Sequence, residues 1–279
     1  MKMKVFSFTL FSIGIAVLVG CMNRCDVEQS DALSELMPVP VKVERRCGSV
    51  CASVTGNVSV VTATVAGARP ETADEAYILE VHKDAIRITA PTKRAELWAR
   101  TTLEQLARLS GGRIPCCRIT DWPRFRWRGF MHDSGRNFLE VEHVKGLIDA
   151  MSRCKMNLFH WHFTEYYGWR LESKIYPQLQ KDSSFYIRYI GKYYTHEDFK
   201  DVVAYAAQKG VTVMPEFDIL GHALAFRRAF GFETMRDEGV QQEFLIYFFC
   251  GTIMKSSKVF IFFHISKMSF RLNRTNLTV

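Results

Sequence analysis

Between residues 128 and 218 the sequence alternates short apolar runs with amphipathic stretches. The apolar runs lie at 128–133, 156–163 and 211–218. The intervening stretches repeat apolar residues at helical spacing, and the second opens with a capping box formed by Thr195 and Asp198. Strands that alternate with helices pair in parallel, and the eight-stranded barrel is a common closed form of that arrangement. We therefore predict an α/β fold that contains about the first three strands of a TIM-type (β/α)8 barrel.

A smaller α+β region precedes this alternation. Apolar and polar residues alternate over 77–81 and again over 86–88, on either side of a Lys83-Asp84 turn. This pattern is typical of a hairpin with one buried face. Apolar residues then recur at helical spacing over 95–109 and stop at Gly111-Gly112. One helix on a small sheet makes a self-contained domain.

The first residues have the pattern of an export signal. Lys2 and Lys4 precede an apolar run over 5–19, which is shorter than a membrane span. The run ends Leu-Val-Gly-Cys at Cys21, which resembles the lipobox of bacterial lipoproteins. We expect Cys21 to be acylated and to anchor an exported lipoprotein in the periplasm or on the outer-membrane surface. The alternative is a plain signal with an incidental cysteine.

Charge and cysteine content restrict the possible partners. Lysine and arginine number 37 against 29 acidic residues, a formal charge of +8, but most of the excess lies in the two terminal segments. We therefore expect no nucleic-acid binding. An oxidising compartment permits disulfides, and Cys47 with Cys51, or Cys116 with Cys117, could form them. Buried free thiols are the equal alternative for these cysteines.

Polar side chains gather at the ends of the three apolar runs. They are Arg128, Asp133, His160, His162, Glu165, Glu216, Asp218 and His222. A barrel would bring the strand ends into one pocket. His160 and His162 are two residues apart on a strand, so both point to one face. Such a pair is also how metal-dependent amidohydrolases hold zinc, although one or both histidines could be hydrogen-bonded core residues.

Six short motifs, in order, resemble glycoside hydrolase family 20. They are WRGFM (127–131), KMNLFHWHFT (155–164), GWR (168–170), YT (194–195), VMPE (213–216) and GH (221–222). The resemblance covers about residues 36–240. It implies a β-N-acetylhexosaminidase that acts on glycans ending in N-acetylglucosamine or N-acetylgalactosamine. It implies no cofactor and no metal, because the 2-acetamido carbonyl of the substrate is the nucleophile.

The resemblance also implies roles for four residues. Arg128 would bind hydroxyls of the terminal sugar, where the planar fork of its donors suits a vicinal diol, and His162 would line the same site. His222 would support the catalytic acid by bonding to a carboxylate at the end of the second strand. That carboxylate is Glu165, in a Glu-Tyr-Tyr run where the family has Asp-Asp-Gln.

The family's adjacent Asp-Glu catalytic pair, which follows Gly-Gly on the fourth strand, has no counterpart that we accept. Asp74-Glu75 lies in the small domain, and no apolar strand leads into Asp237-Glu238. Residues 243–279 hold seven of the 21 phenylalanines and no alanine, proline or aspartate. A shifted reading frame near Gln242 would explain this break. We expect this chain to be a truncated and inactive fragment of the enzyme with no catalytic residue retained.

These observations divide the chain into five segments. They are a signal peptide (1–20), a tether (21–35), the small domain (36–123), a partial catalytic barrel (124–242) and an aberrant tail (243–279). Two other functions stay open. One is a metal-dependent amidohydrolase on the same kind of barrel. The other is a non-catalytic glycan-binding lipoprotein with a sugar-contact patch around Arg128.

Overall fold

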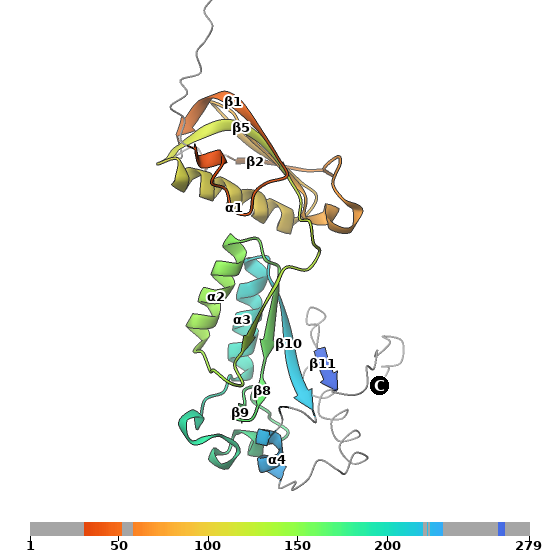
Figure 1. Cartoon of the computed structure of the whole chain (residues 1–279), viewed down its shortest axis with the longest axis vertical. Helices are drawn as coiled ribbons and strands as arrows, with labels where there is room; N and C mark the ends of the chain where they lie inside the picture. Colours follow the sequence, from red (N-terminus) through yellow and green to blue (C-terminus); the bar gives the residue numbers. More distant parts are fainter. Residues whose placement is uncertain (1–30, 52–57, 220–221, 223, 231–261, 266–279) are drawn as a thin grey trace, which may run out of the picture.

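The computed structural model describes residues 31–51, 58–219, 222, 224–230 and 262–265. These residues form two units that follow one another along the chain (Figure 1). The parallel strands of the second unit begin beside the first unit and run away from it. Within the described part of the chain, no helix has both the length and the apolar character needed to cross a membrane.

The first unit is a five-stranded sheet with one long helix on its face. Its elements are β1 (Lys42–Cys51), β2 (Val58–Thr62), β3 (Tyr77–Val81), β4 (Ile86–Ala90), α1 (Lys93–Leu109) and β5 (Arg113–Asp121). The strand order is β1-β5-β3-β4-β2, antiparallel except for the parallel pair β2–β4. Leu79 and Ile88 pack with Trp98 and Leu106 of α1 in a closed core. The predicted hairpin and helix are therefore confirmed.

The second unit is a parallel sheet with helices between its strands. Its elements are β6 (Gly129–Asp133), α2 (Val141–Arg153), β7 (Leu158–His162), β8 (Thr164–Glu165), β9 (Gly168–Trp169), α3 (His196–Gln208), β10 (Thr212–Ile219), α4 (Leu224–Phe230) and β11 (Phe262–Ile265). Among the described residues, short 3-10 helices also lie at Pro177–Gln180, Asp182–Ser184 and Ile187–Tyr189 in this unit, and at Asp31–Leu33 and Pro70–Glu75 in the first unit. The order β11-β10-β7-β6 is parallel throughout.

The helices of this unit lie where the sequence pattern placed them. Thr195 caps α3, its hydroxyl accepting from the Asp198 amide while the Asp198 carboxylate accepts from the Thr195 amide. Trp161 of β7 packs in a buried aromatic core with Phe163 and Tyr194. His160 and His162 alternate with the buried aromatic residues along β7. Their side chains therefore point to the opposite face of the sheet, away from the helices.

Strand β11 corrects the expectation for the C-terminal segment. Phe262–Ile265 pairs in parallel with β10, with Glu216 opposite Phe262 and Ile219 opposite Ile265. The composition of residues 243–279 predicted no barrel strand there. A run of four aromatic and β-branched residues is enough to form one strand. The average composition of the whole segment does not reveal so short a run. The described sheet has four parallel strands, where the sequence predicted about three.

Neither proposed cysteine pair is formed. Cys51, Cys116 and Cys117 form no disulfide, and the disulfide of Cys47 joins it to none of these three. The two thiols on β5 are buried, as the alternative interpretation held. Neighbouring residues on a strand point to opposite faces, so the side chains of Cys116 and Cys117 diverge.

Candidate functional site

The register of the parallel sheet places three polar residues in one row. Asp133 of β6 and Glu216 of β10 both lie opposite His162 of β7. Strands in register put such residues on the same face, so the row points away from the helices. The row lies at the carboxyl edge of the sheet, which is where barrel enzymes carry their chemistry.

One carboxylate oxygen joins the two histidines of β7. Glu216 Oε2 lies 2.7 Å from His162 Nδ1 and 2.7 Å from His160 Nε2. The prediction that both histidines share a face is therefore confirmed. His162 is buried and His160 is half-buried.

Charge and burial compete at this contact. Burial alone would raise the pKa of Glu216, but hydrogen bonds from His160 and His162 outweigh it and lower the pKa to about 2. Burial also disfavours the charged form of His162, yet its bond to Glu216 raises its pKa above the ordinary 6.5. Glu216 is therefore ionised at every working pH and is unsuited to donate a proton.

A second cluster lies beside the row and involves Glu165, His222 and Arg136. Glu165 Oε1 lies 2.5 Å from His222 Nδ1 and 2.5 Å from Arg136 Nη2. The Glu165 side chain is 5% exposed, whereas that of Arg136 is 51% exposed. The expected contact between His222 and Glu165 is therefore present, although the family has a different residue at position 165. Its supporting role in catalysis stays a prediction.

The loop after β6 holds Arg136 against this cluster. The amides of Ser134 and Gly135 donate to the His162 carbonyl at 3.0 and 3.3 Å. A Cβ on Gly135 would lie 2.6 Å from Glu165 Cβ, so only glycine permits the close approach. Asp133 Oδ2 pairs with Arg136 Nη1 at 2.9 Å.

Arg170 braces the same loop from beneath. It is fully buried, and its guanidinium donates to the carbonyls of Ser134, Gly135 and Lys192 at 2.9–3.0 Å. Burial lowers its pKa to about 10, which leaves it charged near neutral pH. Sequence reasoning missed both Arg136 and Arg170. The available signal was that Arg136 follows the end of an apolar run by three residues.

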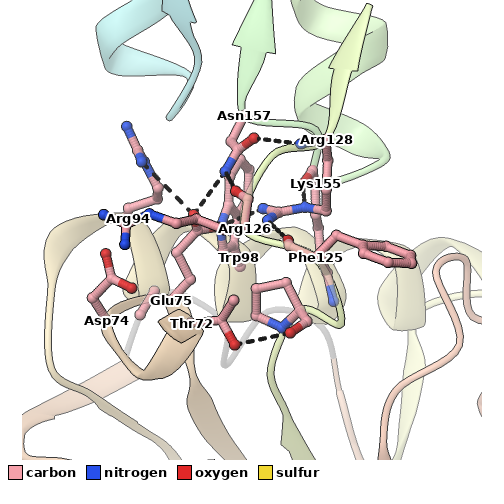
Figure 2. Close-up of polar contacts among 12 residues, drawn as sticks. Thr72, Asp74, Glu75, Arg94, Trp98, Phe125, Arg126, Arg128, Lys155 and Asn157 are labelled. Carbon is pink, nitrogen blue, oxygen red and sulfur yellow. Dashed lines mark hydrogen bonds and ion pairs between the residues drawn. The ribbon is translucent and has the colours of Figure 1, made fainter. Parts of the chain in front are cut away.

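Arg128 lies apart from this site, at the opposite end of the sheet, although the sequence predicted that it binds sugar there. It precedes β6, whereas Asp133 ends it, and the five residue steps from one to the other span about 16 Å. Its Nη2 pairs with Glu75, and its Nε and Nη1 donate to the carbonyls of Lys155 and Phe125 at 2.8 and 2.9 Å (Figure 2). The start of a parallel strand faces the small domain, and the end faces the site.

Glu75 is the centre of that junction. Its buried carboxylate also accepts from Trp98 Nε1 of α1 at 2.7 Å and from Asn157 Nδ2 at 2.8 Å (Figure 2). Asn157 immediately precedes β7, and Trp98 belongs to the small domain. A second buried pair, Lys155 Nζ to Asp121 Oδ2 at 2.9 Å, lies at the same end of the sheet. These contacts join the two units and leave the opposite edge to the chemistry.

Two groups of donors could hold a metal ion among the described residues. They are Asp133, His162 and Glu165, and then His162, Glu216 and Asp218, each within 4.8 Å of one another. Both contain His162 and neither contains His160. A zinc site of the amidohydrolase kind would use both histidines of β7 as ligands. One ring nitrogen of His162, Nδ1, is already bonded to Glu216.

A small α+β domain, followed by parallel strands with a charged carboxyl edge, defines the start of a barrel hydrolase. The family model "Glycosyl hydrolase family 20, catalytic domain" matches residues 125–264, and "Glycosyl hydrolase family 20, domain 2" matches residues 52–122. The chain belongs to glycosyl hydrolase family 20. The catalytic-domain match extends to residue 264 and so includes most of β11.

Relatives and solved structures agree with this assignment. The chain is 39% identical over 189 residues to a beta-hexosaminidase of Vibrio furnissii, and 37% identical over 171 residues to one of Porphyromonas gingivalis. These matches cover 62% and 56% of this chain, but only 31% and 22% of the relatives. The chain thus spans a third or less of their length.

Two solved structures show the same partial coverage. A β-N-acetylhexosaminidase of Bacteroides fragilis superposes with a TM-score of 0.61 at 31% identity. An exo-β-N-acetylglucosaminidase of Vibrio harveyi, in complex with N-acetylglucosamine, gives 0.62 at 30% identity. Each comparison covers 70% of this chain, with 47% and 38% of the respective structures.

Proposed function

We propose that this chain carries the first part of the sugar-binding face of a β-N-acetylhexosaminidase. Its ligand is the terminal N-acetylglucosamine or N-acetylgalactosamine of a glycan. The observation that carries the proposal is the cluster of Arg136, Glu165 and His222 beside the row that ends at Glu216. Membership of the family and the names of its relatives support the substrate class.

Arg136 is the residue that binds sugar hydroxyls. Two of its nitrogens are fixed by Asp133 and Glu165, and half of the side chain is exposed to a ligand. A guanidinium has five donors in a rigid plane, so it can hold two adjacent hydroxyls while it keeps its carboxylate partners. His222 limits the movement of Glu165 and thereby the position of Arg136.

The 279 residues by themselves bind the sugar without cleaving it. Substrate-assisted cleavage requires an aspartate that orients the acetamido group and a glutamic acid that protonates the leaving oxygen. Asp74-Glu75 is ruled out, because Glu75 is occupied at the junction with the small domain. Glu216 is held ionised, as described above. Asp237-Glu238 lies outside the described residues.

The test pairs a kinetic measurement with a binding measurement on the full chain. Hydrolysis of a chromogenic N-acetylglucosaminide is expected to stay at background. N-acetylglucosamine binding, followed by ligand-observed NMR, is expected for the wild type and lost in Arg136→Ala. Arg87→Ala, an exposed arginine on β4, is the matched control and should bind normally. Turnover above background, or sugar binding that survives Arg136→Ala, would contradict the proposal.

The metal-dependent amidohydrolase remains a second candidate because donor groups around His162 lie close together. The two functions differ in a measurable requirement, since substrate-assisted cleavage needs no metal. We expect elemental analysis of the purified chain to show substoichiometric zinc, unchanged by His162→Ala. One zinc per chain, lost in that variant, would favour the amidohydrolase instead.

Export and lipid anchoring are part of the same proposal. The charged start, the apolar run over 5–19 and the Leu-Val-Gly-Cys sequence before residue 22 support acylation of Cys21. A surface anchor would place the chain where glycans occur outside the cell. Metabolic labelling with a fatty acid should mark the wild type and not Cys21→Ser. Equal labelling of both chains would refute the anchor without affecting the sugar site.

A further inference from the structure

A group of tyrosines lies at the carboxyl edge of the sheet and has no part in the cluster described above. Tyr166 and Tyr167 form the tip of the hairpin between β8 and β9, and Tyr186 and Tyr189 approach from the following loop. We call these four residues the tyrosine patch. Tyr166 is 55% exposed and Tyr186 is 43% exposed. Exposed aromatic rings that gather at one edge of a site mark a binding surface.

The tyrosine patch is held together by contacts that fix its rings. Tyr167 lies 5.9 Å from Tyr166, 5.4 Å from Tyr186 and 5.9 Å from Tyr189, measured between ring centroids. The amide of Tyr186 donates to the Tyr167 carbonyl at 3.0 Å. Beneath them, the guanidinium of buried Arg170 stacks 4.6 Å from the Tyr189 ring. Because the rings are already held in place, a ligand that binds here loses little free energy to the ordering of side chains.

The tyrosine patch is continuous with the Arg136 cluster. The amide of Tyr166 donates to Glu165 Oε2 at 2.7 Å, while the other oxygen of that carboxylate holds Arg136 and His222. The Tyr189 hydroxyl donates to the Arg136 carbonyl at 2.7 Å. Hydrogen bonds therefore join both ends of the patch to the residues that face the terminal sugar.

We propose that Tyr166 and Tyr186 stack against a second sugar ring, next along the glycan from the terminal N-acetylhexosamine. A pyranose has C–H groups on its flat face and hydroxyls at its rim. A tyrosine ring offers a flat apolar face with a hydroxyl at its edge, so the two surfaces match. The Arg228 guanidinium, 5.7 Å from the Tyr166 ring centroid, adds donors beside the stack.

This inference rests on the proposed function, and it narrows the substrate to oligosaccharides of at least two sugars. Tyr166 stands where the family has an aspartate, so the surface belongs to this chain and does not follow from the resemblance. An acidic partner would require more cations at the exposed rings, and a protein partner would require a wider apolar surface. A neutral glycan needs neither.

The experiment compares mono-, di- and trisaccharides of N-acetylglucosamine as ligands of the full chain. We expect the disaccharide and trisaccharide to bind about five- to tenfold more tightly than the monosaccharide, a gain typical of one stacked aromatic contact. Tyr166→Ala and Tyr186→Ala should each reduce that gain. Tyr166→Phe keeps the ring and should keep the gain. Phe125→Ala removes an exposed ring at the opposite end of the sheet and serves as the matched control.

The outcomes separate this inference from the proposed function. A chain that binds all three sugars equally overturns the inference and leaves the proposed function intact. A gain that survives both alanine substitutions also overturns it. A chain that binds none of the sugars contradicts the proposed function, and the inference with it.

Discussion

Replacing Arg128 by alanine should lower the free energy of unfolding without a direct effect on the sugar site. The substitution removes the charged partner of a buried carboxylate, Glu75, and two hydrogen bonds to carbonyls. Each carbonyl bond contributes about 1 kcal/mol. Loss of a buried ion-pair partner costs about 3–5 kcal/mol when no other donor remains. Trp98 and Asn157 still donate to Glu75, so we take the lower part of that range at most.

Two carbonyl bonds and at most about 3 kcal/mol for the ion pair give a loss of up to about 5 kcal/mol in the free energy of unfolding. This is a large share of the ~5–15 kcal/mol that stabilises a folded domain. Arg128→Lys keeps the charge but has no planar fork, so it should recover only part of the loss. The matched control is Arg87→Ala, since that side chain is exposed on β4. We expect it to cost less than about 1 kcal/mol.

The assay is urea unfolding of the full chain, followed by tryptophan fluorescence. Trp98, which donates to Glu75, is one of the five tryptophans whose emission follows the unfolding. A cycle with Glu75→Gln measures the coupling between the two charges, expected at about 1–3 kcal/mol. The reasoning is refuted if Arg128→Ala unfolds within about 0.5 kcal/mol of the wild type, the range of ordinary surface substitutions. It is equally refuted if that variant keeps its stability and loses sugar binding.

The remaining predictions concern titration, thiols and aggregation. The NMR titration midpoint of His162 should lie above 6.5 and fall in Glu216→Gln, because the hydrogen bond and charge of Glu216 no longer oppose the effect of burial on the pKa. The bond between them should stabilise the chain most between pH 4.5 and 6.5. His162 contributes less as pH rises through its raised pKa, and Glu216 contributes less as pH falls from 4.5 toward about 2. Exposed Cys154 should react with iodoacetamide in the folded chain, whereas Cys117, whose pKa burial raises to about 12, should react only in urea, as peptide mass mapping would show. Phe130→Lys, on the outer edge strand β6, should slow aggregation measured by light scattering, because a charge opposes edge-to-edge pairing; unchanged aggregation would exclude that edge as the cause.

The periodic parts of the fold could be predicted from sequence because their rules are local. Residues that are two apart on a strand share a face, and this rule was enough to predict that His160 and His162 lie together, as they do at Glu216. The capping box of Thr195 depends on residues three apart and formed as expected. The contact between His222 and Glu165 joins distant residues and came from the family resemblance alone.

The ends of strands could not be predicted with the same accuracy. Arg128 and Arg136 bracket one short strand, and a shift of the strand by a few residues would exchange their places. Hydrogen bonds fix the residues at which β6 begins and ends. Asn157 accepts from the Arg128 amide before the strand begins, and Asp133 accepts from the Arg136 amide after it ends. Such contacts between separate segments leave no periodic signal. The same holds for β11, whose partner strand precedes it by more than 40 residues.

The two arginines show why the two ends of a parallel sheet serve different purposes. The Arg128 side chain is 18% exposed, and each of its three guanidinium nitrogens already bonds to a protein atom. Arg136 also has charged partners, yet half of its side chain is open to solvent beside an exposed tyrosine surface. An arginine that binds a ligand must be held in position while some of its N–H donors stay exposed. An arginine that stabilises the fold directs its donors to protein atoms instead. The exposure of a fixed charge is therefore the property that favours Arg136 over Arg128 as the proposed sugar-binding arginine.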